Sequence, residues 1–241
     1  MSHSLPLDRS PRWKRAPRPR RREWPNFFVG FRVTSPELVA KVETLQTAIR
    51  DACPEVAPCL IDPSTLHVTL CVLRLPDDAA IEQACQVLHS EAARVAAEEF
   101  ARDSPPRFDF SEWDFFGRND ILHAKLDVKS ADGRRLSAVA ERLHSEYCLF
   151  GFTTEKFRRP FTPHMTVWKT SRDRELIKNL NAGRETTEPS AQDEVFRVVM
   201  SFAATDGLGS ESPRSIELLN MKETGEDGYY KQVASAFWCD V

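Results

Sequence analysis

Short segments rich in aromatic and β-branched residues recur along the chain from residue 27 to its end. The first of them, Phe27 to Val33, has the composition of a buried strand. Glycine- and glutamate-rich stretches at 205–214 and 223–228 separate later segments and are typical of turns. We expect strands at residues 27–33, 66–73, 108–113, 121–128, 161–168, 195–203, 215–221 and 230–237.

Other segments repeat their apolar residues at the spacing of a helix. Ser35, Pro36 and Glu37 form a helix start, with a capping serine, a proline at the first helical position and an acid in the first turn. The apolar residues that follow share one helix face, and they are Leu38, Val42, Leu45 and Ile49. We expect further helices at residues 79–102, 136–149 and 173–181.

The order of these elements contains a weak internal duplication. A strand, a helix and a second strand span residues 27–73, and the same order recurs over residues 121–168. The second strand of each unit holds a histidine, 34 residues after Val33 in one unit and 36 residues after Val128 in the other. Strands and helices are mixed without strict alternation, so we predict an α+β fold. It should have two pseudo-symmetric lobes with largely antiparallel sheets flanked by helices around a central cleft.

The most informative residues are two copies of the pattern His-x-Thr-x, in which x is apolar. The copies are His67-Val68-Thr69-Leu70 and His164-Met165-Thr166-Val167, at matching places in the two units. Side chains alternate between the faces of a strand, so each histidine shares a face with its threonine. The alternative is two ordinary sheet histidines beside threonines favoured by β-propensity. Two copies in matching strands favour a shared function over that alternative.

Two histidines and two hydroxyl groups that face one cleft are suited to phosphodiester chemistry. One imidazole can act as a base while the other acts as an acid, because histidine titrates near neutral pH. Threonine hydroxyls can donate to the non-bridging phosphate oxygens, where charge gathers in the transition state. We predict His67 and His164 as the catalytic pair and Thr69 and Thr166 as phosphate ligands, with no metal and no cofactor. The near-equivalence of the motifs leaves open which histidine is the acid.

Charge is distributed unevenly along the chain, whose net charge is −3. Residues 1–22 carry eight basic side chains and one acidic side chain, whereas the remaining residues carry 25 basic and 35 acidic ones. We expect residues 1–25, rich in proline and arginine, to be a disordered basic tail or linker that adds at most non-specific RNA affinity. Residues 26–241 are expected to form the two-lobed domain. Its acidic balance implies that local geometry, not a global field, holds any anionic ligand.

Composition is that of an ordinary soluble protein, with 41% hydrophobic and 29% charged residues. No apolar run approaches the roughly 20 residues needed to cross a bilayer, and the N-terminus lacks the apolar region of a secretory signal. None of the six cysteines forms a C-x-x-C pair or has a histidine at zinc-finger spacing. We expect an intracellular, monomeric protein without a membrane span, and the sequence predicts no particular protein partner.

The paired His-x-Thr-x motifs and the segments around them resemble the motifs of the two-histidine (2H) phosphoesterases and, within that family, the A-kinase-anchoring-protein type of domain. The resemblance covers roughly residues 24–238 and rests on Pro25-Asn26-Phe27-Phe28-Val29, Leu66-His67-Val68-Thr69-Leu70, Phe161-Thr162-Pro163-His164-Met165-Thr166 and Gly228-Tyr229-Tyr230. It implies two lobes around a water-filled cleft, with His67 and His164 as the catalytic pair. It also implies ligands such as AMP, a 2′,5′-oligoadenylate or a 2′,3′-cyclic phosphate, without selecting one of them.

Basic residues precede the second motif strand. Arg158 and Arg159, with Lys156, would hold a terminal phosphate or steer an anion into the acidic body. The alternative is a solvated basic loop.

Several aromatic residues are also predicted to contact the substrate. Trp168 would share the face of His164 on a regular strand, where it would line the cleft or stack on a base. Tyr229 and Tyr230 follow a glycine turn and resemble the family's tail, where an aromatic side chain approaches the base, although core packing is an equal alternative. By the same alternation Cys71 would share the face of His67, but burial as a small hydrophobe is favoured. His123 is assigned no role.

Three functions are consistent with these observations. The first is a metal-independent phosphodiesterase acting on RNA-type substrates, with a 2′,5′-linked oligoadenylate or a 2′,3′-cyclic phosphate end as the favoured substrate. The second is a nucleotide- or RNA-end-binding module with little or no turnover. The third is RNA ligation, the reverse reaction.

Overall fold

The computed structural model describes residues 24–92, 94, 98, 106–153, 161–184, 188–202 and 207–237. The predicted basic tail therefore lies outside the described residues except for its last two positions. The strands are β1 (Phe27–Arg32), β2 (His67–Leu73), β3 (Phe108–Phe116), β4 (Ile121–Leu126), β5 (His164–Lys169), β6 (Gly209–Glu211), β7 (Ser215–Thr224) and β8 (Tyr230–Phe237). The α-helices are α1 (Pro36–Ala52), α2 (Asp78–Val87), α4 (Ala131–Leu149), α5 (Arg174–Ala182) and α6 (Ala191–Ser201).

All eight strands belong to one sheet, in the order β6-β3-β4-β5-β2-β1-β7-β8, and all the pairings are antiparallel. The α+β class and the antiparallel pairing are thus confirmed. The two predicted lobes are two halves of a continuous sheet, because β2 and β5 pair at its centre. Counted inward from the two edges of the sheet, the third strand is β4 on one side and β1 on the other, and the fourth is β5 or β2. Strands β1 and β2 therefore occupy places equivalent to those of β4 and β5. This is the arrangement expected of the internal duplication.

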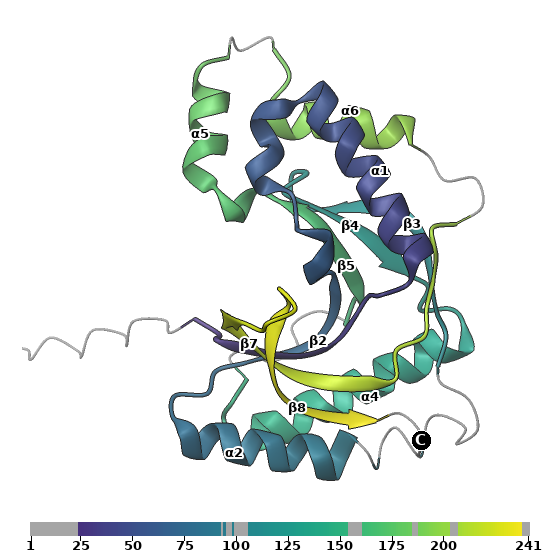
Figure 1. Ribbon diagram of the computed structural model, residues 1–241, viewed down its shortest axis with the longest axis vertical. Coiled ribbons are helices and arrows are strands. Elements are labelled where there is room, and N and C mark those ends of the chain that lie inside the picture. The colour runs from purple at the N-terminus through teal and green to yellow at the C-terminus, as the bar shows by residue number, and fades with distance from the viewer. Residues whose placement is uncertain are drawn as a thin grey trace, which may run out of the picture.

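Each half of the sheet is covered by a helix that follows a strand of the other half (Figure 1). Helix α1 follows β1 but packs with α6 over the half that contains β3, β4 and β5. Helix α4 follows β4 but packs with α2 against β2 and its neighbours. The side chain of Gln46 in α1 illustrates the crossing, since its amide donates to the carbonyl oxygens of Ile61 (2.6 Å) and Val167 (3.1 Å). The crossed helices tie the two halves together.

The two units match residue by residue around the sheet centre. In the first unit Arg32 lies opposite His67 and Gly30 lies opposite Thr69. At the equivalent places of the second unit Lys125 lies opposite His164 and His123 lies opposite Thr166. Both basic residues are neutralised by the strand beyond, through the ion pairs Arg32–Glu217 (3.2 Å) and Lys125–Glu112 (3.2 Å). The units differ at the position of Gly30, which His123 occupies in the second unit.

Strand β6 falls in a stretch predicted as a turn, and it holds the start of α1. The buried carboxylate of Glu211 accepts hydrogen bonds from the backbone amides of Thr34 (2.5 Å) and Ser35 (2.7 Å). These amides precede the first turn of the helix, where a negative charge is stabilising. The contact is between residues far apart in sequence, so local patterns do not predict it.

The predicted strand at residues 195–203 is wrong, because this segment lies largely in helix α6. Ser190 and Asp193 form a capping box, in which each side chain accepts from the backbone amide of the other residue. Val195 and Val199 are four residues apart and are both buried, which is helical spacing. The valine-rich composition suggested a strand, but the cap and the packing against α1 decide for a helix.

The predicted helix at residues 79–102 is helical wherever it is described. Helix α2 is followed by the π-helical turn Leu88–Ala92, and residues 94 and 98, the other described residues of this stretch, are helical as well. Among the described residues, no helix is both long enough and apolar enough to cross a membrane.

Candidate functional site

The motif side chains emerge together on one face of the sheet centre. Strands β2 and β5 are joined where Val68 lies opposite Met165, and both of these residues are fully buried. Register partners share a face, so the residues before and after them all point to the opposite face. The residues brought together there, each partly exposed, are His67, Thr69, His164 and Thr166.

Both imidazoles are oriented by the same backbone contact. The Nδ1 atom of His67 lies 2.8 Å from the carbonyl oxygen of Thr65, and that of His164 lies 2.8 Å from the carbonyl oxygen of Thr162. A carbonyl only accepts, so Nδ1 carries the proton in each neutral ring. The Nε2 atom of each ring is then left for a ligand, as a base when neutral and as a donor when protonated.

A bulge in β2 changes which side chains share the histidine face. Val29 pairs with Cys71 and Gly30 pairs with Thr69, so Leu70 is an extra residue in β2. Leu70 and Cys71 are consequently both buried. The expected position of Cys71 on the histidine face is therefore wrong, whereas its burial as a small hydrophobe is confirmed.

The same bulge occurs at the same place in β5. Leu122 pairs with Trp168 and His123 pairs with Thr166, which leaves Val167 as the extra residue. Trp168 is fully buried, so its predicted position on the face of His164 is wrong. A side chain with no exposed surface offers no face to a base. Alternation holds up to the threonine of each motif and fails at the bulge.

Aromatic rings enclose His67. The ring centroid of Phe28 lies 4.6 Å from that of His67, and Tyr230 meets His67 edge to face at 5.4 Å. Tyr230 is partly exposed and so lines the histidine face, where it was predicted to contact substrate. Tyr229, predicted for the same role, is only 2% exposed, which places its ring in the interior. There Tyr229 packs edge to face against Tyr230 and lies 3.9 Å beneath the guanidinium of Arg32.

A different pair of rings encloses His164. Phe116 meets it edge to face at 4.9 Å, and His123 meets it at 5.2 Å with an interplanar angle of 73°. His123 is fully buried and stacks on Phe116 at 3.9 Å. The sequence predicts no role for His123, since nothing in the local pattern indicates that it lies opposite Thr166.

Lys169 is a site residue that sequence analysis did not identify. It is the last residue of β5, partly exposed, and its ammonium charge acts on His67. Burial lowers its pKa, and the nearby charge of Arg172 lowers it further. Among the described residues Lys169 makes no ion pair. A half-buried cation near His67, without an acidic partner in the described part of the chain, is suited to an anionic ligand.

The two motif histidines have different electrostatic surroundings. Burial lowers the pKa of His67 to about 4; the hydrogen bond to Thr65 opposes this, and the charges of Lys169 and His164 add to it. Burial also lowers the pKa of His164, against the hydrogen bond to Thr162. Because the charge of His164 lowers the pKa of His67, the two rings are near enough to interact electrostatically. Without a bound anion, both imidazoles are neutral at pH 7.

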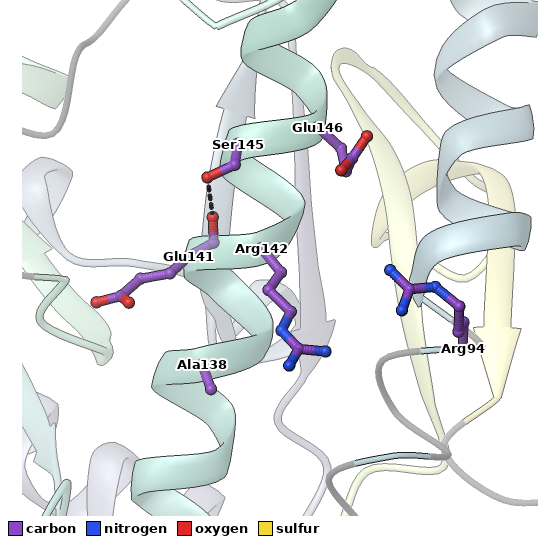
Figure 2. A pocket seen from close by; sticks show the side chains of 6 residues that line it. All are labelled: Arg94, Ala138, Glu141, Arg142, Ser145 and Glu146. Atoms are coloured by element: carbon purple, nitrogen blue, oxygen red, sulfur yellow. Dashed lines mark hydrogen bonds between the residues drawn. The ribbon is translucent and has the colours of Figure 1, made fainter.

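Arg158, Arg159 and Lys156 lie outside the described residues. Among the described residues, no group of three or more His, Cys, Asp or Glu side chains is placed to hold a metal ion. Figure 2 shows a pocket that contains none of the motif residues, between helix α4 and Arg94; it is lined by Arg94, Ala138, Glu141, Arg142, Ser145 and Glu146. Arg94 and Arg142 both pair with Glu98, at 2.9 and 2.6 Å, so their charges are partly balanced.

Comparison with known proteins agrees with the duplicated motif. A family model described as the AKAP7 2′5′ RNA ligase-like domain matches residues 25–236. A-kinase anchor protein 7 isoform gamma of Homo sapiens is 24% identical over 210 residues, which cover 86% of this chain and 55% of that protein. The chain thus spans about half the length of this curated relative.

Solved structures share the fold at low sequence identity. E. coli LigT complexed with 3′-AMP has a TM-score of 0.56 at 16% identity, covering 88% of this chain and 97% of that one. LigT complexed with NADP+ has a TM-score of 0.55 at 16% identity, covering 90% and 98%. The TT0787 protein of Thermus thermophilus has a TM-score of 0.52 at 18% identity, covering 88% and 97%.

Proposed function

The chain belongs to the AKAP7 2′5′ RNA ligase-like domain family, and from this premise we propose that it is a metal-independent phosphodiesterase acting on RNA-type substrates. The observation that carries the proposal is the pair of imidazoles on one face, each beside a threonine hydroxyl, whose Nε2 atoms make no hydrogen bond within the described part of the chain. General acid–base catalysis of this kind contributes roughly 10² to 10⁴ in rate.

Each group has a chemical role in this proposal. One neutral imidazole accepts a proton from water or from a ribose hydroxyl through Nε2, and the oxygen attacks phosphorus. The other imidazole, protonated at Nε2, donates to the departing oxygen. The hydroxyls of Thr69 and Thr166 and the ammonium of Lys169 stabilise the negative charge on the non-bridging oxygens.

Lys169 distinguishes the two histidines. Its positive charge opposes protonation of His67, whereas the pKa of His164 carries no such contribution. The single proton that the pair needs is therefore held at lower cost on His164. A bound phosphodiester raises the pKa of both rings, because an opposite charge favours the protonated form. We accordingly assign His67 as the base and His164 as the acid.

The favoured substrates are a 2′,5′-linked oligoadenylate and a 2′,3′-cyclic phosphate end. The name of the matching family model supports a 2′,5′ linkage in RNA, and the 3′-AMP bound to E. coli LigT supports an adenine nucleotide that carries its phosphate on the 3′ oxygen. The partly exposed ring of Tyr230 beside His67 supplies a stacking surface for a base.

The test is a product assay on purified protein with 2′,5′-linked, 3′,5′-linked and 2′,3′-cyclic substrates, with EDTA present. His67→Ala and His164→Ala should each reduce the rate at least 100-fold. His89→Ala, at an exposed histidine away from the motifs, should cleave like the wild type. Equal cleavage by the wild type and the double variant His67→Ala/His164→Ala would refute the proposal.

A nucleotide-binding module with little turnover is the second candidate. The lowered pKa of both histidines favours it, because a ring that stays neutral cannot supply the acid that turnover needs. Calorimetry with AMP and a 2′,5′-oligoadenylate, beside the product assay, separates the two functions. Binding that requires Lys169 and both threonines, without product after long incubation, would establish the module.

A further inference from the structure

His123 is a buried imidazole that the reaction proposed above does not use. It is fully buried, and its contact with the backbone of Ile121 falls short of a well-aligned hydrogen bond, so neither ring nitrogen is well satisfied within the described part of the chain. A buried polar group with poor hydrogen bonding lowers the stability of the folded chain. The buried neighbours of His123 along β4 are apolar, so packing by itself does not account for an imidazole at this position.

The surroundings of His123 connect it to His164. It lies opposite Thr166 in the β4–β5 register, so its side chain projects on the same face as Thr166 and His164. Its ring stacks on Phe116 with an interplanar angle of 14°, and both rings meet His164 nearly at right angles, at 73° and 86°. These three rings form what we call the aromatic corner, in which the stacked pair of Phe116 and His123 is the wall and His164 stands nearly perpendicular to it.

The aromatic corner restricts the orientation of the His164 ring, which the hydrogen bond to Thr162 does not fix by itself. The hydrogen bond from Nδ1 to Thr162 selects the tautomer of His164, but one bond about which the ring can pivot does not set the direction of Nε2. The stacked pair of Phe116 and His123 does, because both rings stand nearly at right angles to His164. In the first unit Gly30 stands at the position of His123, where an added Cβ would lie 2.3 Å from the carbonyl oxygen of Val68, and the rings beside His67 are instead Phe28 and Tyr230.

We propose that His123 is a positioning residue, whose ring, backed by Phe116, aims the Nε2 atom of His164 at the phosphate. The inference rests on the proposed function for its purpose, but the geometry it describes can be measured without turnover. The role belongs to the ring and not to its nitrogens, so phenylalanine at the same place should fulfil it.

The test compares His123→Phe, which keeps an aromatic wall, with His123→Val, which suits a strand and removes the wall. Selectively labelled histidine followed by NMR gives the pKa of each ring, with His67 as the internal reference. The charged groups that act on His123 are His164 from β5, Asp114 from β3 and Lys125 from β4. None of these is altered by either variant.

In His123→Val we expect the pKa of His164 to rise by roughly 0.5 to 1, because loss of the wall lets water reach the ring. The turnover number should fall about 10-fold with little change in KM. His123→Phe should keep both values and have a higher Tm than the wild type. A merely structural residue would change Tm and leave the pKa of His164 in place.

The proposal is overturned if His123→Val folds with the wild-type pKa at His164, or if His123→Phe shifts that pKa as much as valine does. Should His123→Val not fold, the phenylalanine variant and Phe116→Leu provide the same comparison. If the wild type lacks turnover, the NMR result still decides whether the corner positions His164.

Discussion

Val68 lies directly opposite Met165 at the point where β2 and β5 join the two halves of the sheet. Both side chains are fully buried, and every motif histidine and threonine is a sequence neighbour of one or the other. This pair therefore sets the relative position of two motifs that are about one hundred residues apart in the chain. Val68 and Met165 therefore contribute both to the stability of the fold and to the geometry of the site.

Shortening the side chain of Met165 should impair both the stability of the fold and the geometry of the site. We expect Met165→Ala to lower the free energy of unfolding by about 2–5 kcal/mol, the usual cost of deleting a buried large side chain. The matched control is Met221→Ala on β7, where the side chain is exposed and the expected change is within about 0.5 kcal/mol. Denaturant unfolding measures both, and a Met165→Ala protein as stable as Met221→Ala would contradict the central role of the pair.

Removing the threonine hydroxyls should weaken transition-state stabilisation while leaving the strand intact. We expect Thr69→Val and Thr166→Val each to reduce kcat/KM about 10- to 100-fold, since a hydrogen bond to a charged group contributes about 1.5–3 kcal/mol. Thr44→Val, at an exposed threonine of α1, is the control. Unchanged kinetics in both motif variants would remove the threonines from the site.

Lys169→Met should weaken the binding of AMP about 10-fold, because a half-buried cation that no described acidic side chain pairs with is lost from the site. The pKa of His67 should rise in the same variant, since the positive charge that lowers it is gone. Lys169→Arg should retain most of the affinity, and Lys178→Met, an exposed lysine of α5, should behave like the wild type. Calorimetry and NMR titration measure the two effects, and equal affinity in Lys169→Met and Lys178→Met would exclude Lys169 as an anion ligand.

Stability should fall on acidification because buried histidines must remain neutral in the folded chain. Burial lowers the pKa of His67 and His123 to about 4, below the ordinary value of about 6.5 in the unfolded chain. Between these values the unfolded chain binds more protons, so stability is complete above about pH 6.5 and is lost as the pH falls toward 4.

The histidine share of this loss can be isolated with His123→Phe. The advantage in Tm of this variant over the wild type should be larger at pH 5 than at pH 7.5, because phenylalanine has no proton to take up. Parallel Tm curves for the two proteins across that range would show that His123 is not held neutral by the fold.

Much of the fold could be predicted from local patterns. The apolar strands, the helix that begins after Ser35 and the repeated His-x-Thr-x motifs are all features of short stretches, and the structure has them where expected. The errors arise where a distant contact decides. The valines of 195–203 suit a strand or a helix, and packing against α1 selects the helix.

The sequence by itself determined that two strands each present an imidazole beside a hydroxyl, because the alternation of side chains along a strand is a local rule. Only the tertiary structure decided which other side chains join them. The bulges that bury Cys71 and Trp168 depend on the register with a neighbouring strand, and so does the position of His123 opposite Thr166. Lys169 faces His67 because two strands from different units meet at the sheet centre, which is a relationship in space that no stretch of the chain records.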